Sequence, residues 1–323
     1  MTPEQLTYLI FGGLLILALT FDLGLLSKKT SHITIKKAIL QTLFWVGLAI
    51  SFFVYLWFER GHVLALEYVS AYLMEWSLSI DNIFVFILIF TFFKVKEDYY
   101  ARVLLIGILT AIFLRIIFIS VGIVLVEKFH WILYIFGAFL VYTGVKIFSH
   151  KSNEMIDLEK NKVYSLLKKI VRLTPEDNKG KMTMVINGKK HYTTIFVVVM
   201  MLATTDVVFA IDSIPAVFAI SQDRLVIYSS NIFAVLGLRS LFFLLQGAVN
   251  KFAHLQQGIA IVLIFIGLKM LGEDLITRFV NKGSLVYISL IVILVCIAGS
   301  IVYSISTADK DTKEEINLPE DSE

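Results

Sequence analysis

The sequence predicts an all-α polytopic membrane protein whose chain crosses the bilayer about nine times. Of its 323 residues, 58% are hydrophobic and the mean hydropathy is +0.81, whereas soluble domains contain about 45–50% apolar residues. The apolar residues form stretches of about 17–29 residues, and about 20 residues of helix cross the hydrocarbon core. These stretches lack the alternation of polar and apolar residues that a membrane β-barrel requires. The predicted spans are 7–26, 39–58, 65–93, 103–126, 131–148, 194–220, 225–248, 255–271 and 284–305.

The distribution of Lys and Arg predicts an outer N-terminus and a cytoplasmic C-terminus. In this orientation about 21 of the 29 Lys and Arg residues fall in cytoplasmic segments and about six on the outer side, as the preference of basic residues for cytoplasmic loops requires. The first residues, Met-Thr-Pro-Glu-Gln, lack the positive charge of a cleaved signal peptide. We therefore expect the first span to be retained as a helix.

These spans divide the chain into four segments. Residues 1–148 hold the first five spans, 149–193 form a cytoplasmic loop, and 194–305 hold the last four spans. Residues 306–323 form an acidic cytoplasmic tail without aromatic residues, and this composition is typical of disorder.

The loop 149–193 contains two predicted elements. Residues 153–172 have the pattern of a short amphipathic helix at the membrane surface. Residues 182–194 have the pattern of two strands joined by an Asn-Gly turn, which indicates a hairpin.

An internal repeat relates residues 65–148 to residues 194–271. The first span of each copy carries an acid, four residues, Ile-Asp, a small polar residue and Ile. The acids and polar residues of the two copies are Glu75, Asp81 and Asn82, and Asp206, Asp212 and Ser213.

Two further landmarks match in order. The second span of each copy contains a matching segment, GILTAIFLR ending at Arg115 and NIFAVLGLR ending at Arg239, and the third carries a Gly-x-Lys sequence ending at Lys146 and Lys269. Because each copy has three spans, the second copy enters the membrane from the opposite side. This predicts two inverted three-helix repeats, an architecture common among secondary transporters, although a purely structural duplication would leave the same pattern.

The charged residues within the spans indicate a cation site. An ionised group at the centre of the bilayer costs about 2.5–3.5 kcal/mol on insertion scales, so we expect the four acids, Arg115 and Arg239 to meet in the interior. One salt bridge in each repeat would leave two acids unmatched. The six groups together carry two excess negative charges, which one divalent cation would neutralise, so the arginines are interpreted as charge-balancing residues.

The ligand atoms in both motifs are oxygens. Neither motif contains Cys or His, and the single cysteine, Cys296, lies in an apolar stretch. Carboxylate, amide, hydroxyl and carbonyl oxygens favour Mn²⁺, Mg²⁺ or Ca²⁺ over Zn²⁺ or Cu⁺. The predicted metal ligands are therefore Glu75, Asp81, Asn82, Asp206, Asp212 and Ser213.

The spacing within each motif restricts the geometry. Residues six apart on an ideal helix point about 120° apart, so one small ion cannot bind both acids of a motif if the helix is straight. Either the helix breaks or the two acids serve successive steps of a path. Pro215 favours a break in the second copy, because it leaves the Ile211 carbonyl without its helical donor and available as a ligand.

Two other polar residues are candidates for accessory roles. Asp22, at the end of the first span, is either a residue through which the ion enters or an interfacial anion. Asn231 lies within the seventh span, where it is either a ligand or an interhelical hydrogen-bonding residue.

The motifs resemble those of the TerC family of bacterial membrane proteins. The resemblance covers about residues 7–305 and is carried by EWSLSIDNIFVF (75–86), TTDVVFAIDSIPAVFAI (204–220), SNIFAVLGLRSLFFLL (230–245) and FDLGLL (21–26). It places the six motif residues at the family's acidic-motif positions. One departure is Ala203, where members of the family often carry Glu.

The resemblance implies Mn²⁺ efflux across the bacterial plasma (inner) membrane. The family takes its name from tellurium resistance, is grouped with LysE-type exporters, and is linked in some bacteria to metal supply for exported enzymes. We therefore expect an exporter that works by alternating access, with proton antiport as the coupling hypothesis. Mn²⁺ is expected as the substrate, no bound cofactor is expected, and the expected partners are the lipid bilayer and the cation.

Other classes of function receive less support. A non-transporting membrane partner or scaffold, linked to tellurium resistance or metal supply, is the main alternative, although the sequence identifies no protein partner. An intramembrane aspartyl protease is disfavoured because Ile80 and Ile211 precede the aspartates and no Gly-x-Gly-Asp sequence occurs, so we expect no enzyme activity. The net charge of +3, without a basic motif, gives no indication of nucleic-acid binding.

The orientation can be tested with reporter fusions. A cytoplasm-active reporter fused after Glu323 should be active, and a periplasm-active reporter fused there should be silent. Fusions within the 149–193 loop serve as the second cytoplasmic position. The opposite pattern at both positions would show that the orientation is inverted.

Overall fold

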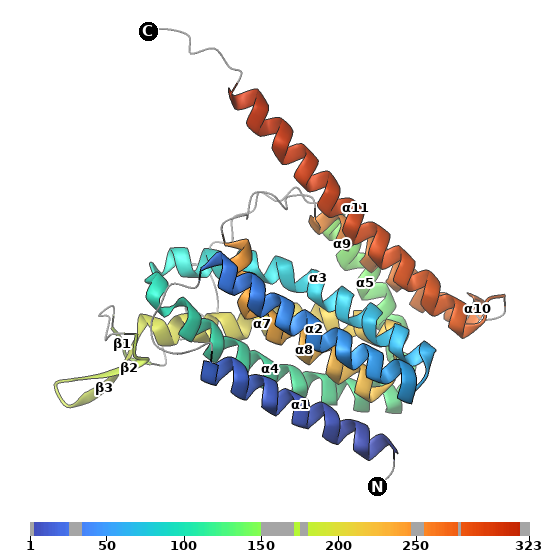
Figure 1. The fold of residues 1–323 in the computed structure, drawn as a ribbon, viewed down its shortest axis with the longest axis horizontal. Coiled ribbons are helices and arrows are strands. Elements are labelled where there is room, and N and C mark those ends of the chain that lie inside the picture. Colours follow the sequence, from blue (N-terminus) through green and yellow to red (C-terminus); the bar gives the residue numbers. More distant parts are fainter. Residues whose placement is uncertain are drawn as a thin grey trace.

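The chain folds into a bundle of long helices. The computed structural model describes residues 3–25, 34–149, 171–174, 180–246, 255–276 and 279–316 (Figure 1). The long helices are α1 Pro3–Leu25, α2 Ile35–Glu59, α3 His62–Phe92, α4 Glu97–Lys128, α5 Ile132–Ser149, α7 Thr194–Ile220, α8 Arg224–Leu245, α9 Leu255–Leu271 and α11 Lys282–Ile316, and one further turn, α10, covers Glu273–Ile276.

Every predicted span corresponds to one of these long helices. Among the described residues, seven helices are long and apolar enough to cross a membrane, and the shorter apolar stretches Leu9–Thr20 in α1 and Gln256–Leu271 in α9 complete the set. The prediction of an all-α polytopic membrane protein is confirmed.

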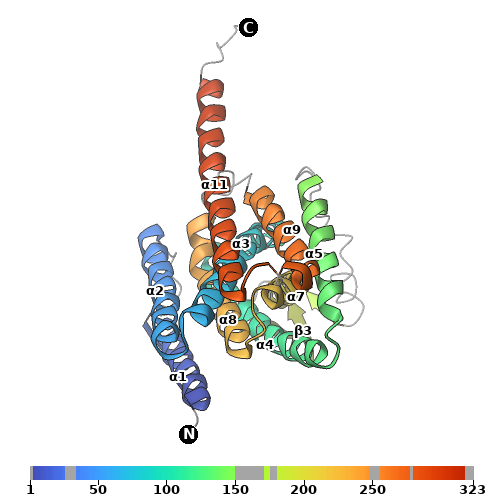
Figure 2. The ribbon, with the colours of Figure 1, turned by 90° about the vertical axis from the view of Figure 1, so that its right-hand side faces the viewer.

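The two repeats, α3–α5 and α7–α9, are interlocked. The first helix of each repeat packs against the second helix of the other, since α3 contacts α8 and α7 contacts α4. The third helices, α5 and α9, pack against each other, and α3 also contacts α7. Figure 2 shows α1 and α2 on one side of the bundle and α5 and α9 on the other.

Glycines set the contact between α5 and α9. A Cβ atom added to Gly144 would lie 2.8 Å from the Ala260 carbonyl oxygen, and one added to Gly267 would lie 2.7 Å from the Gly137 carbonyl oxygen. Gly144 and Gly267 occupy matching positions, and so do Gly137 and Ala260, seven residues earlier in each copy. The contact of Gly144 with Ala260 is therefore the counterpart of the contact of Gly267 with Gly137. The two helices run antiparallel, as an inverted repeat requires.

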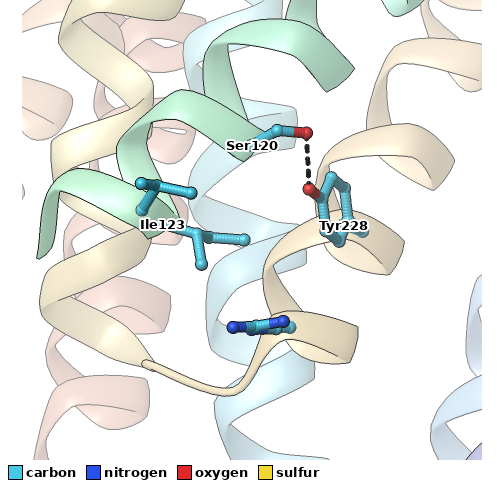
Figure 3. Close-up of a pocket in the computed structure, with 5 residues that line it drawn as sticks. Ser120, Ile123 and Tyr228 are labelled. Carbon is cyan, nitrogen blue, oxygen red and sulfur yellow. Dashed lines mark hydrogen bonds between the residues drawn. The ribbon is translucent and has the colours of Figure 1, made fainter. Parts of the chain in front are cut away.

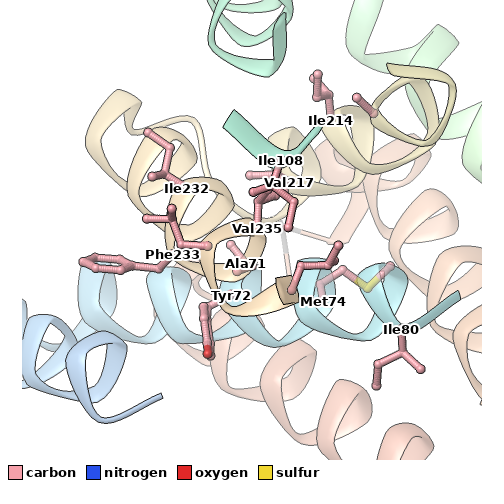
Figure 4. Close-up of a cluster of buried hydrophobic side chains, with 14 of the residues drawn as sticks. Ala71, Tyr72, Met74, Ile80, Ile108, Ile214, Val217, Ile232, Phe233 and Val235 are labelled. Atoms are coloured by element: carbon pink, nitrogen blue, oxygen red, sulfur yellow. The ribbon is translucent and has the colours of Figure 1, made fainter. Parts of the chain in front are cut away.

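Apolar side chains from α3, α4, α7 and α8 fill the centre of the bundle. Figure 4 shows Met74 of α3, Ile108 of α4, Val217 of α7 and Val235 of α8 in one buried cluster. Helix α1 joins this core through Phe11, whose ring lies 5.5 Å from the rings of both Phe52 and Phe233 between centroids. The interior around the charged residues is therefore apolar.

The predicted hairpin is confirmed. Strands β2 (Thr183–Ile186) and β3 (Lys189–Thr193) are antiparallel. Asn187 and Gly188 join them with φ angles of 50° and 70°, which is the backbone of a type I′ turn. A short strand that the sequence did not indicate, β1 (Leu173–Thr174), pairs in parallel with β3 and gives the order β1-β3-β2. The predicted amphipathic helix at 153–172 lies outside the described residues except for its last two positions.

The predicted break at Pro215 is wrong, because α7 is helical from Thr194 to Ile220 with Pro215 inside it. The proline removes one hydrogen bond, and side-chain packing on both sides of it holds the helix. Ile214 and Phe218 both lie within 4 Å of the space beside Gly122 of α4. A side chain at Gly122 would collide with the Phe218 ring, so the two helices are in close contact at this level.

The tail is also more ordered than predicted. Residues 306–323 have a composition typical of disorder, but α11 continues to Ile316. Ala308, Lys310, Lys313 and Glu314 have favourable helix propensities, and the preceding apolar helix provides a nucleus from which further turns can extend. Residues beyond Ile316 lie outside the described part of the chain.

The contact between α5 and α9 predicts a specific sensitivity to side-chain size. Gly267→Ala should destabilise the protein by about 1–3 kcal/mol, because its Cβ meets a backbone oxygen that cannot rotate away. Gly47→Ala in α2 is the control, since a Cβ there meets no atom within 4 Å. Unfolding in detergent would measure both variants, and equal stability would show that the α5–α9 contact is looser than described.

Candidate functional site

Arg115 of α4 joins the first acids of both repeats. Its Nη1 donates to Oε1 of Glu75 on α3, and its Nη2 lies 3.2 Å from each carboxylate oxygen of Asp206 on α7. The exposed fractions of these three side chains are 1–2%. A buried ion pair in apolar surroundings requires close partners, and here one guanidinium supplies them to two helices.

Asn231 of α8 completes this arrangement. Its Oδ1 accepts a hydrogen bond of 3.1 Å from Arg115 Nη1, and its Nδ2 donates to the Ile227 carbonyl at 2.9 Å. The side chain is fully buried. The four helices that form the first and second elements of the two repeats thus each contribute one residue to a single network.

Polar residues continue along the same faces of α3 and α7. Residues four and seven positions apart share a helix face, so Ser79 and Asn82 lie on the Glu75 face, and Ser213 lies on the Asp206 face. All three are 1–2% exposed. An acid and the amide or hydroxyl seven residues later therefore share one helix face, whereas the six-residue spacing between the acids of a motif does not place them on one face.

Four buried polar atoms on these helices have no hydrogen-bond partner in the described part of the chain. They are Glu75 Oε2, Ser79 Oγ, Arg115 Nε and Ser213 Oγ, and the other side-chain atoms of this kind belong to Gln41 and Thr42 of α2. A buried polar atom without a partner costs about 1–3 kcal/mol. Two hydroxyls and a carboxylate oxygen are acceptors of the kind that a hard cation prefers.

The remaining predicted residues have different outcomes. Arg239 is buried, with 5% of its surface exposed. Asp81 and Asp212 lie in helical backbone, but their side chains are outside the described set, and the same holds for Asp22 in α1. Their roles therefore stay predictions. Among the described residues, no group of three His, Cys, Asp or Glu side chains is arranged to hold a metal.

Ile211 lies at the surface of the bundle. Its side chain is 51% exposed and that of Val208 is 60% exposed, whereas the matching residues of α3, Ile80 and Ser77, are 3% and 1% exposed. Helices α2 and α11 pack on α3, and neither is among the main neighbours of α7. Although α7 continues beyond it, Pro215 still leaves the Ile211 carbonyl without its helical donor, so the role of this carbonyl as a ligand stays a prediction.

The sequence did not indicate two features of the site. It left open one salt bridge within each repeat as the alternative to a shared site, whereas Arg115 pairs with acids of both repeats. It also left out Glu67 of α3, whose Oε2 accepts a 2.5 Å hydrogen bond from Ser221 in the connection between α7 and α8. Both contacts cross between repeats, so spacing along the chain contains no sign of them.

A pocket of about 400 Å³ lies between α4 and α8 (Figure 3). It is lined by Ser120, Ile123, Val124, Arg224 and Tyr228. The Ser120 and Tyr228 hydroxyls are 2.7 Å apart, and Arg224 donates to Glu127. Ser120 follows Arg115 by five residues and Tyr228 precedes Asn231 by three, so the pocket lies within about 8 Å of the ionic network along the helix axes.

The fold and the network define an integral membrane protein in which two inverted repeats share a buried ionic site. The model of the integral membrane protein TerC family matches residues 60–312, which include both repeats and most of α11. The chain therefore belongs to the TerC family.

Relatives of similar length support this assignment. An uncharacterized membrane protein of Myxococcus xanthus is 40% identical over 266 residues, covering 82% of this chain and 83% of the relative. An uncharacterized membrane protein of Rickettsia felis is 38% identical over 300 residues, 93% of this chain and 97% of the relative. A protein of Escherichia coli named "Putative membrane-bound redox modulator Alx" is 38% identical over 281 residues, which cover 83% of this chain and 87% of the relative. No solved structure matches.

The shared guanidinium predicts that Glu75 and Asp206 are energetically coupled. Glu75→Gln or Asp206→Asn alone leaves Arg115 one carboxylate, whereas the double variant leaves its charge without a carboxylate partner. The double variant should therefore lose more stability than the sum of the single variants, by about 0.5–3 kcal/mol. Unfolding of all four proteins in detergent measures this coupling. Additive losses would show that the two acids do not share Arg115.

Proposed function

We propose that this protein is a transporter that moves Mn²⁺ out of the cytoplasm across the bacterial plasma membrane. The observation that carries this proposal is the meeting of Glu75 and Asp206, matching acids of two inverted repeats, on one buried guanidinium between α3 and α7. Secondary transporters built from inverted repeats bind their substrate at the interface of the copies, near the middle of the membrane.

The chemistry of the residues favours a hard divalent cation. The candidate ligands whose side chains the structure describes are the carboxylates of Glu75 and Asp206, the amide of Asn82, and the hydroxyls of Ser79 and Ser213. All of them provide oxygen. Asp81 and Asp212 are the further acids that the two motifs would contribute. Mn²⁺ is chosen among the hard cations because the sequence carries the acidic motifs whose resemblance implies manganese efflux.

The packing supports alternating access. Because the first helix of each repeat packs on the second helix of the other, a displacement of one repeat relative to the other changes both sides of the acidic site together. We propose that such displacements open the site first to the cytoplasm, where the 149–193 loop and the C-terminus lie, and then to the outside. Protons are the proposed counter-ions, carried by acids of the path other than Glu75 and Asp206, which pair with Arg115.

A role without transport is the alternative. In that case the ionic network would only hold the helices together, and the cytoplasmic loop would bind a partner. A redox role based on a disulfide within the chain gains no support from the sequence, which contains one cysteine. Transport by the purified protein separates these functions, because a scaffold moves no metal by itself.

Transport of Mn²⁺ can be measured in liposomes containing the purified full-length protein. The wild type should release trapped Mn²⁺ faster than protein-free vesicles, and Glu75→Gln, Asp81→Asn and Asp212→Asn should each reduce the rate by about tenfold or more, because each removes a carboxylate expected at the cation path. Glu59→Gln, at the exposed end of α2, is the matched control and should transport like the wild type. Parallel trials with Mg²⁺, Ca²⁺ and Zn²⁺ establish selectivity.

Equal release from wild-type and protein-free vesicles would reject the proposal. Full activity in all three acidic variants would also reject it, since the carboxylates would then have no part in the movement of the ion.

A further inference from the structure

Arg115 makes the contacts that a cation between Glu75 and Asp206 would make. Its Nη1 lies on Glu75, and its Nη2 is equidistant from both oxygens of Asp206, at 3.2 Å. It comes from a third helix, α4, and is 2% exposed. The guanidinium therefore neutralises carboxylates from both repeats at the point where the repeats meet.

The guanidinium and a divalent cation would contend for the same oxygens. Three of the four carboxylate oxygens of Glu75 and Asp206 accept from Arg115, and only Glu75 Oε2 lacks a partner among the described residues. Hard divalent cations take six or more oxygen ligands. A cation bound by both carboxylates would also be repelled by a guanidinium at hydrogen-bonding distance from them, so binding requires Arg115 to withdraw.

Asn231 gives Arg115 a neutral contact that can survive this withdrawal. Its Oδ1 accepts from Nη1 at 3.1 Å, and its own Nδ2 is fixed to the Ile227 carbonyl at 2.9 Å. The amide has no net charge and so does not need replacing when a cation takes the carboxylates. In the other repeat, the position matching Asn231 is Gly107, so the amide is present in one copy only.

We propose that Arg115 is a tethered competitor of the transported cation. It pairs with Glu75 and Asp206 when no cation is bound, and it is displaced from them, while held by Asn231, when a cation binds. This inference rests on the proposed function and adds a role to it: the tethered charge allows the unloaded transporter to return, so that net export does not require another metal ion on the way back.

The test compares binding, exchange and net flow for three variants of the full-length protein. Mn²⁺ binding is measured by calorimetry in detergent, and ⁵⁴Mn movement is measured in liposomes with Mn²⁺ on both sides or on one side. Arg115→Gln removes the competing charge, Arg115→Lys keeps it, and Arg102→Gln, at an exposed position of the same helix, is the matched control.

Arg115→Gln should bind Mn²⁺ about tenfold more tightly, within the range of coupling between competing sites. It should retain exchange of Mn²⁺ for Mn²⁺ but lose most net flow, because its unloaded carboxylates carry uncompensated charge. Arg115→Lys should lie between Arg115→Gln and the wild type, and Arg102→Gln should match the wild type in all three measurements.

Weaker or unchanged binding in Arg115→Gln would overturn the proposal, and so would equal loss of exchange and net flow. If that variant does not fold, Asn231→Leu provides the test with the opposite sign: without the amide, Arg115 should hold the carboxylates more firmly, and Mn²⁺ binding should weaken. Unchanged or tighter binding there would contradict the proposal. If the wild type binds Mn²⁺ but moves none, the proposed function fails, while the binding comparison still decides the competition.

Discussion

A positive charge buried in apolar surroundings must stay close to negative ones, and Arg115 meets this constraint with carboxylates from two separate repeats. Removing one member of a buried ion pair costs several kcal/mol, yet replacing a whole pair with apolar residues of equal volume is often no loss. Stability alone therefore does not explain why charges occupy this position. Their place at the junction of α3, α4, α7 and α8 is better explained by a role in which the charges change partners.

Two kinds of contact hold the repeats together, and they differ in how readily they can rearrange. Between α5 and α9, backbone oxygens lie where glycine side chains would begin, so these helices cannot slide without collisions. At the ionic network, long side chains meet through hydrogen bonds that can be exchanged for others. A displacement of one repeat relative to the other would thus turn about the close contact of α5 and α9 and alter the contacts of Arg115.

The sequence predicted what depends on local pattern and failed where the answer depends on contacts between distant segments. Apolar length located the nine long helices of the described residues, and Asn187-Gly188 located the turn. The matched acids and the odd number of spans predicted the inverted repeats. Pro215 was misinterpreted because packing of Ile214 and Phe218 on α4 outweighs one lost hydrogen bond. The partner of Arg115 on α7, and its amide contact on α8, could not be found from spacing, since 91 and 116 residues separate these pairs.

The unequal covering of α3 and α7 has a consequence for energetics. Ile80 lies beneath protein, whereas its counterpart Ile211 is half exposed and, in a bilayer, would touch acyl chains. At this level one repeat therefore packs against protein, and the other faces lipid. The two arrangements that an exact duplicate would populate equally are no longer equivalent, and the thickness and composition of the lipid become part of the balance between them.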